Sequence, residues 1–241
     1  MVGQRITGRP ATFAGLVLAF LLLSAAASLA DAYRHGFRRI SDSSAVDVAS
    51  QLSVDIAGYG SNQVVFTFQN SGVVASGAVI ADIYFDDRAG LLLSLDGILD
   101  RDYDKKQYPG VDFSTPAKPL NLPGGKSIDP VFRVTDALSF DADNPGPKWG
   151  IGVAESLGLR FNAAADGLDA ILGAIHSSDF RIGLHVQCLP AFVADGSYTD
   201  TSASDGFATT APLPDAAILG TSGLSLAAYW LKRRHGGLAG I

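Results

Sequence analysis

The stretch QLSVDIAGYGSNQVVFTFQN, residues 51–70, decides the fold of this chain. In residues 51–58 apolar and polar side chains alternate, and residues 62–70 are rich in β-branched and aromatic side chains. A period of two predicts half-buried strands, because successive side chains of a strand point to opposite faces of a sheet. The intervening GYGSN consists of residues that favour turns. The stretch therefore predicts two β-strands separated by a turn.

Three later stretches, residues 77–87, 155–163 and 181–190, follow the same alternation, with turn-forming residues between the runs. The chain has 27 glycines, and only one of its 24 acidic residues is a glutamate. This composition favours strands and turns, because aspartate is a turn former whereas glutamate is a helix former. Together these observations predict a mainly β protein, an antiparallel β-sandwich of the jelly-roll or Ig-like kind.

One segment, residues 166–179, has the period of a helix. Its apolar side chains recur at the i, i+3, i+4, i+7 spacing, at Leu168, Ile171, Leu172 and Ile175. Asp166 stands where an N-cap residue is expected. The pattern predicts one short helix within the β domain.

Composition and charge exclude several classes of function. The chain of 241 residues has a formal net charge of −6 and no basic cluster within its central part, so nucleic acid is not an expected partner. A single cysteine, Cys188, excludes an intrachain disulfide framework and a zinc site built from several cysteines.

The first thirty residues form a secretory signal peptide by composition. Arg5 and Arg9 give a positive start, residues 11–23 form a short apolar core, and small residues follow up to Ala30. We predict a signal peptide over 1–30, cleaved after Ala30, with the Sec translocon and signal peptidase as partners. An N-terminal membrane anchor is the alternative.

The C-terminal segment, residues 211–241, begins with two prolines and continues with a short apolar run at 215–231. Tyr229 and Trp230 end that run, and a basic cluster follows at once. Aromatic residues at a membrane interface and a basic flank predict a transmembrane helix with its C-terminus in the cytoplasm. The alternative is an amphipathic helix packed on the protein core. A secreted β-sandwich domain then occupies residues 31–210.

This arrangement resembles the PEP-CTERM sorting signal of Gram-negative bacteria. The matching residues are Pro212, Leu213, Pro214, Lys232, Arg233 and Arg234. Leu213 stands where the family usually has a glutamate. The order of inner motifs is also similar to that of many exported PEP-CTERM proteins, at residues 68–72, 83–87, 122–125, 155–158, 181–187 and 204–207.

The resemblance implies a route and a destination. The protein would be held in the inner membrane by its C-terminal helix and recognised by a membrane peptidase, exosortase. It would then reach the cell surface or the extracellular matrix. The resemblance carries over no catalytic residue.

The stretch RIGLHVQCLP, residues 181–190, places His185 three positions before Cys188. On a strand these two side chains point to opposite faces, and their α-carbons lie about 10 Å apart. We predict that Cys188 shares the buried face of Ile182 and is a small buried hydrophobe. His185 would lie on the outer face. Whether it contacts a residue of another strand there is not decided by the sequence.

Two further motifs suggest ligand binding. PGGKS, residues 123–127, lacks the first glycine of a phosphate-binding loop and is predicted to be a hairpin turn. Asp100, Asp102 and Asp104 have the spacing of the first ligands of a calcium loop, but its glycine and its final acid are missing. A looser calcium site that also uses acids from elsewhere is the alternative to a solvated loop, with candidates Asp86, Asp87, Asp141 and Asp143. No other cofactor is expected.

The sequence offers no complete catalytic constellation, and we predict that the protein is not an enzyme. The first hypothesis is a non-catalytic protein of the envelope or the extracellular matrix, structural or adhesive in surface polysaccharide or biofilm. The first alternative is a carbohydrate-binding module that uses loop aromatics, with candidates Tyr103, Tyr108 and Trp149. The second is a secreted hydrolase, which requires a cleft joining Glu155 or His185 to another ionisable group.

Overall fold

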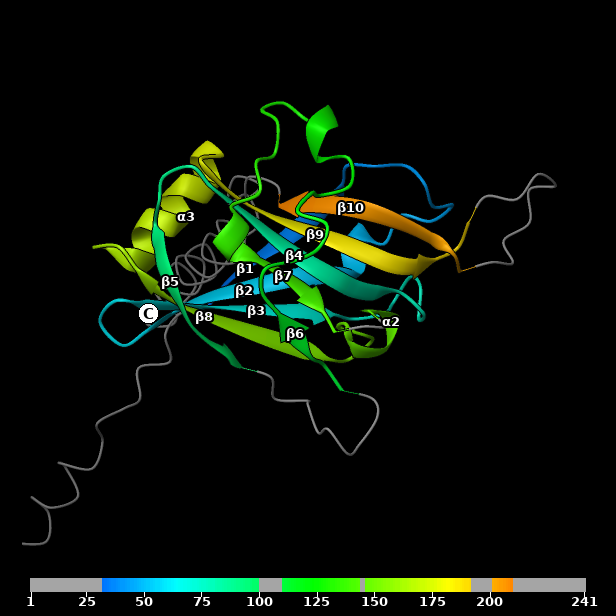
Figure 1. The fold of residues 1–241 in the computed structure, drawn as a ribbon, viewed down its shortest axis with the longest axis horizontal. Helices are drawn as coiled ribbons and strands as arrows, with labels where there is room; N and C mark the ends of the chain where they lie inside the picture. Colours follow the sequence, from blue (N-terminus) through cyan, green and yellow to red (C-terminus); the bar gives the residue numbers. More distant parts are fainter. Residues whose placement is uncertain (1–31, 100–109, 144–145, 192–200, 210–241) are drawn as a thin grey trace, which may run out of the picture. The chain divides into compact units, whose positions relative to one another are not determined.

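The computed structural model describes residues 32–99, 110–143, 146–191 and 201–209 (Figure 1). Its strands are β1 (Tyr33–Arg39), β2 (Leu52–Tyr59), β3 (Gln63–Asn70), β4 (Val79–Asp87), β5 (Leu92–Leu99), β6 (Phe113–Ser114), β7 (Ser139–Ala142), β8 (Ser156–Ala163), β9 (Phe180–Leu189) and β10 (Ala203–Thr209). Its helices are α2 (Gly146–Trp149) and α3 (Gly167–Ser177), with 3₁₀ turns η1 (Ala49–Gln51), η2 (Gly125–Ser127) and η3 (Asp136–Leu138).

Several predicted features lie outside the described residues. They are the signal peptide with Ala30, the sorting signal at 212–214 and 232–234 with its helix at 215–231, and the calcium candidates Asp100, Asp102 and Asp104. Among the residues that the structure does describe, no helix is both long and apolar enough to cross a membrane.

All ten strands pair antiparallel in the order β5-β8-β3-β2-β1-β10-β9-β4-β7-β6 and form a nearly closed barrel. Strand β1 connects its two halves, because Tyr33–Gly36 pair with β2 whereas Phe37–Arg39 pair with β10. We call β5, β8, β3, β2 and the start of β1 the first half, and the end of β1 with β10, β9, β4, β7 and β6 the second half. The prediction of a mainly β, antiparallel fold is confirmed.

The core is a cluster of phenylalanine rings contributed by both halves. Phe66 and Phe161 of the first half meet Phe85 of the second half, with ring centroids 5.2 and 5.4 Å apart. Phe85 also contacts Phe140 at 6.2 Å and Phe180 at 5.9 Å. The contacts of Phe85 with Phe66, Phe140 and Phe161 are edge-to-face, an arrangement that stabilises a core beyond the area it buries.

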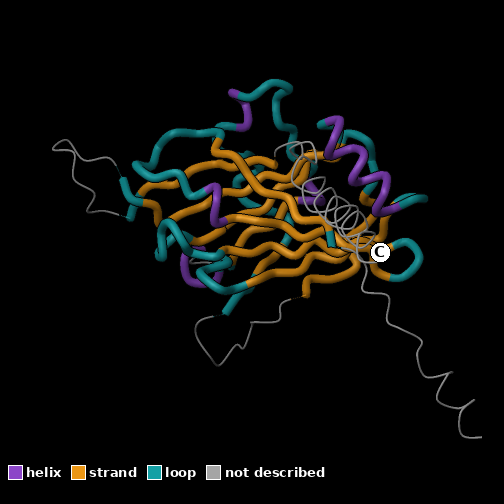
Figure 2. The backbone as a smooth tube through the Cα atoms, turned by 180° about the vertical axis from the view of Figure 1, so that it is seen from behind, coloured by secondary structure: helices purple, strands orange, loops and turns teal. Residues whose placement is uncertain are grey.

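Helix α3 confirms the helical pattern at 166–179 and packs against β2, β3 and β9 at one end of the barrel (Figures 1 and 2). Ile171 and Ile175 are buried in the core, as their spacing predicts. Asp166 does not cap the helix with its side chain as expected. Its φ of 65° places it in the left-handed region, and its side chain makes no capping hydrogen bond.

A long loop covers the outside of the second half. Tyr84 of β4 forms a second apolar cluster there with Ala117, Leu122 and Phe132. The loop lies very close to Gly206 of β10, because a Cβ at that position would stand 1.9 Å from the carbonyl oxygen of Pro123. The predicted hairpin turn at 123–127 is wrong: Gly124 has a φ of 73° and leads into the 3₁₀ turn η2, which lies within the long connection between the paired strands β6 and β7 and does not join two strands directly.

Two buried charged side chains fasten the outer loop and the segment after β1 to the sheet. Arg181 pairs with Asp86 and also donates from Nη1 to the carbonyl oxygen of Pro130 at 2.6 Å. Asp205 accepts hydrogen bonds from Ser41 Oγ and Ser43 N, both at 2.7 Å, and from the backbone and hydroxyl groups of Ser44. These contacts fasten two segments to the sheet without a disulfide.

Candidate functional site

The outward side of the first half carries a surface of polar side chains, which we call the polar face. Its side chains alternate along each strand with the buried core positions. Strand register places them in rows across the strands. The polar face comprises Arg34, Ser53, Asp55, Tyr59, Gln63, Thr67, Gln69, Ser156, Arg160 and Asn162.

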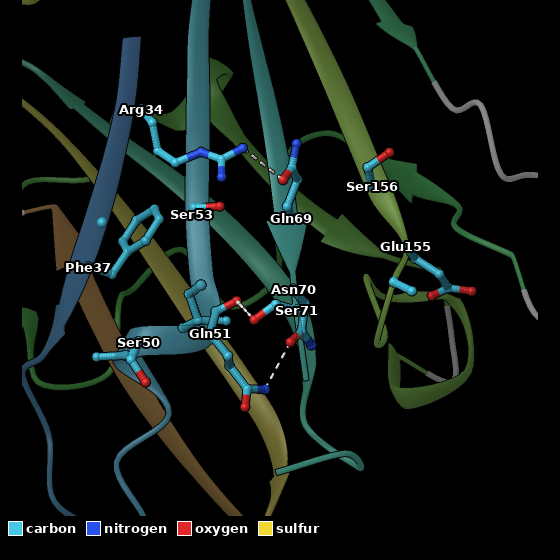
Figure 3. A pocket seen from close by; sticks show the side chains of 14 residues that line it. Arg34, Phe37, Ser50, Gln51, Ser53, Gln69, Asn70, Ser71, Glu155 and Ser156 are labelled. Carbon is cyan, nitrogen blue, oxygen red and sulfur yellow. Dashed lines mark hydrogen bonds between the residues drawn. The ribbon is translucent and has the colours of Figure 1, made fainter. Parts of the chain in front are cut away.

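A cavity of about 690 Å³ opens at the end of the polar face nearest η1 (Figure 3). Arg34, Ser53, Gln69 and Ser156, from four neighbouring strands, line one side of it. Glu155 lies at its rim, where Oε2 accepts a hydrogen bond from the backbone N–H of Gly152 at 2.7 Å. The cavity therefore offers guanidinium, amide, hydroxyl and carboxylate groups within one space.

Arg34 and Gln69, which line this cavity, form a hydrogen-bonded trio with Asp55 of the polar face. Arg34 donates from Nε and Nη2 to the two oxygens of Asp55, each at 2.7 Å. Gln69 donates to Asp55 Oδ2 at 3.1 Å and accepts from Arg34 Nη2 at 3.3 Å. The hydrogen bond from Arg34 lowers the pKa of Asp55, against an opposing effect of burial. The trio is thus held as an ion pair with an amide beside it.

Two buried amides form the base of the cavity. Gln51 is 2% exposed and Asn70 is 1% exposed, and Gln51 Nε2 donates to Asn70 Oδ1 at 2.8 Å. Gln51 Oε1 accepts from the backbone N–H groups of Val74 and Ala75, while Asn70 Nδ2 donates to the carbonyl oxygen of Ala78 at 2.7 Å. Satisfied buried amides make this part of the site rigid.

His185 lies on the outward side of β9, as predicted, and it does meet a residue from another strand. Its Nδ1 is 2.5 Å from Asp82 Oδ2 on β4, and the two residues are directly opposite each other in the sheet. Asp141 of β7 stands opposite Asp82 on its other side. Burial, together with the charge of Asp82, raises the pKa of Asp141. These three residues share a cavity of about 320 Å³ with Lys118 and Gln187.

The prediction that Cys188 is a buried hydrophobe is wrong. Cys188 is half-buried and lines a separate surface cavity. Its φ of 59° breaks the alternation of β9, so Leu189 takes the next buried position. Burial raises the pKa of the thiol. No local feature of the sequence marks this irregularity.

The structure does not bring the additional calcium candidates together. Asp86 pairs with Arg181 and Arg88, and Asp87 accepts hydrogen bonds from the backbone N–H groups that open β5. Asp143 is exposed, and Asp141 belongs to the histidine cluster. Within the described ranges, no group of three or more histidine, cysteine or acidic side chains could hold a metal ion.

Of the three loop aromatics predicted to bind carbohydrate, only Trp149 lies within the described residues. Tyr103 and Tyr108 lie outside the described residues. Trp149 is half-buried against the core, with Lys148 Nζ 4.3 Å from its ring centroid. The aromatic ring on the polar face is instead that of Tyr59, which is 53% exposed. Alternation along residues 51–58, extended by one position, would have placed Tyr59 outward.

Comparisons with known proteins give no match: no protein-family model, curated protein or solved structure matches this chain.

Proposed function

We propose that this chain is an exported, non-catalytic protein of the bacterial envelope or extracellular matrix that binds surface polysaccharide on its polar face. The observation that carries the proposal is the cavity of about 690 Å³, which is lined on one side by outward polar side chains of four adjacent strands. Its volume lies within the range of small-ligand sites.

The chemistry of the cavity suits a sugar. A sugar hydroxyl both donates and accepts hydrogen bonds, and the cavity supplies both kinds of partner through amides, hydroxyls, the guanidinium of Arg34 and the carboxylate of Glu155. These partners are fixed by their own contacts, so binding loses less side-chain entropy than it would on a mobile surface. A polar site of this kind supports adhesion to polysaccharide.

The ends of the chain support an exported location. The signal-peptide composition of 1–30 and the resemblance of 211–241 to a PEP-CTERM signal suggest passage through the Sec translocon and recognition by exosortase. We also propose that the barrel belongs to the β-sandwich class, jelly-roll or Ig-like. The contact of Phe66 and Phe161 from the first half with Phe85 from the second half, across the core, supports this class.

Affinity electrophoresis of the full chain in gels that contain extracellular polysaccharide tests the binding function. We expect retardation of the wild type and a marked loss of retardation for Gln69→Ala. The matched control is Gln187→Ala, an outward glutamine on the second half, which should be retarded like the wild type. Equal retardation of all three proteins, or of none, contradicts the proposal.

A second function, glycoside hydrolysis, is favoured by one observation: Asp82 and Asp141 stand directly opposite on neighbouring strands. Side chains so placed have Cβ atoms about 4.5–5.5 Å apart, so their carboxyl groups can reach the separation of about 5–5.5 Å that retaining glycosidases use. In that chemistry the acid with the raised pKa, Asp141, would protonate the leaving oxygen, while Asp82, hydrogen-bonded to His185, would attack the anomeric carbon.

Release of reducing ends from polysaccharide tests this second function. Wild type should release them, Asp141→Asn should not, and Asp143→Asn should behave like the wild type because Asp143 is exposed and outside the cavity. Release that survives in Asp141→Asn, or no release by the wild type, excludes it.

A further inference from the structure

The end of the polar face farthest from the cavity carries an exposed aromatic ring. Tyr59 is the last residue of β2 and is 53% exposed. The guanidinium carbon of Arg160 lies 5.0 Å from the centroid of its ring. Arg160 is held in turn by Asp96, with Nε 2.5 Å from Oδ2. The ring is thus supported from one side by a fixed cation and remains open to solvent.

A ladder of amides begins beside this ring. Gln63 is opposite Tyr59 in the sheet, and Asn162 is opposite Gln63. Gln63 Nε2 donates to Asn162 Oδ1 at 2.9 Å, and Asn162 Nδ2 donates to Ser94 Oγ at 3.0 Å. A side-chain amide has two donor hydrogens and an acceptor oxygen, so these contacts use only part of its capacity. The remaining positions lie on the same outward surface as the ring.

Small and apolar residues interrupt the polar face between its two ends. Ala57, Val65 and Gly97 occupy the row between the cavity and Tyr59, together with Arg160. From Ser53, which lines the cavity, to Tyr59 is six residues along β2, or roughly 20 Å at the rise of an antiparallel strand. A ligand that uses both ends must therefore be long and lie along the strands.

We propose that Tyr59, Gln63 and Asn162 form a second sugar subsite, and that the polar face binds a linear, uncharged polysaccharide along β2 and β3. This inference rests on the proposed binding function. An aromatic ring provides an apolar surface for the C–H face of a sugar, while the adjacent amides bond its hydroxyls.

The charges of the polar face favour an uncharged chain. Its two guanidinium groups are each paired with a carboxylate, Arg34 with Asp55 and Arg160 with Asp96. An acidic polysaccharide would have to compete with these carboxylates for the cations. Binding of an uncharged chain should depend little on salt, because salt screens interactions between charges.

The test is isothermal titration of the full chain with uncharged linear polymers (glucan, mannan, galactan and xylan), with their disaccharides, and with alginate and hyaluronan as acidic polymers. We expect Tyr59→Ala to weaken binding of the preferred uncharged polymer about tenfold, because it removes the apolar surface of the second subsite. Tenfold corresponds to about 1.4 kcal/mol of binding free energy. Its binding of the disaccharide should be unchanged, because the cavity alone can hold a short ligand. Tyr33→Ala, which removes another exposed tyrosine, should bind both ligands like the wild type.

The outcomes separate the two proposals. If an uncharged polymer binds but Tyr59→Ala matches the wild type, the second subsite is refuted and the binding function stands. If only the acidic polymers bind, and salt abolishes their binding, the inferred ligand class is refuted. If no polymer binds, the binding function itself is refuted.

Discussion

Replacement of Asp205 by asparagine tests how the segment after β1 is fastened to the barrel. Asp205 is fully buried, and its two oxygens accept hydrogen bonds from Ser41 Oγ, Ser43 N, Ser44 N and Ser44 Oγ. The amide nitrogen of asparagine cannot accept a hydrogen bond, so one backbone N–H and one hydroxyl lose their acceptor whichever way the amide is oriented.

The expected loss of stability follows from that count. A buried donor without an acceptor costs about 1–3 kcal/mol, and the hydroxyl can rotate towards another acceptor whereas the backbone N–H cannot. We therefore expect Asp205→Asn to lower the free energy of unfolding by about 1–3 kcal/mol at pH 7. In a chain of this length each kcal/mol lowers Tm by about 2–4 °C.

The pH dependence gives an independent check. Burial raises the pKa of Asp205, but the hydrogen bonds from Ser44, Ser43 and Ser41 outweigh burial, so its pKa lies below the ordinary 3.8. A carboxyl with a lowered pKa stabilises the fold above its unfolded-state pKa and loses that contribution as the pH falls. The difference between wild type and Asp205→Asn should therefore be full at pH 7 and shrink below about pH 3.8.

Urea unfolding at pH 7 and pH 3.5 measures both effects. Arg39 lies between two carboxylates: its Nη1 is 3.7 Å from Asp205 Oδ2, and its Nη2 is 2.7 Å from Asp42 Oδ1. Asp42→Asn is the control, because the side chain of Asp42 is 76% exposed; it should change stability by less than about 0.5 kcal/mol. Either of two results would contradict this role of the Asp205 carboxylate. One is that Asp205→Asn is as stable as Asp42→Asn at pH 7. The other is that the stability lost relative to the wild type is the same at both pH values.

Three further substitutions test the core, the outer loop and a buried histidine, each by urea unfolding. Phe85→Ala should cost about 3–5 kcal/mol because it removes the central ring of the core; a loss below about 1 kcal/mol would contradict that packing. Gly206→Ala should cost about 1–3 kcal/mol because its Cβ would meet the carbonyl oxygen of Pro123, whereas Gly36→Ala, with nothing within 4 Å, should be near neutral; equal effects would disprove the close approach of the loop. Burial lowers the pKa of His35, so the wild type should lose stability between pH 7 and pH 5 as the unfolded chain takes up a proton. His35→Leu should lack that loss, and an identical pH dependence in both proteins would show that His35 is not buried in its neutral form.

The sequence was a good guide wherever burial alternated strictly. Val54 and Phe66 are fully buried at the positions that a period of two assigns to the core, and Ile171 of α3 follows the helical period. Strand β1 escaped prediction because YRHGFRR is dominated by charged and polar residues, and its two inward side chains, His35 and Phe37, do not form an apolar run.

The sites depended on facts that a local pattern does not contain. Alternation directs Gln69 outward, but its place beside Arg34 follows from the order of the strands, which a single sequence does not reveal. His185 and Asp82 are far apart in the chain, and an irregularity after Ile80 sets their register. The left-handed conformation of Cys188 could not be predicted either, because no glycine or other turn-forming residue marks that position.

The most direct test of the central claim, that the polar face binds polysaccharide, is an NMR titration of the side-chain amide resonances of the full chain with an uncharged linear polymer. If the polar face binds the polymer, the resonances of Gln63, Gln69 and Asn162 shift together on binding, while that of Gln187 on the second half stays in place. A shift confined to Gln187, or binding that leaves all four resonances unmoved, would contradict it.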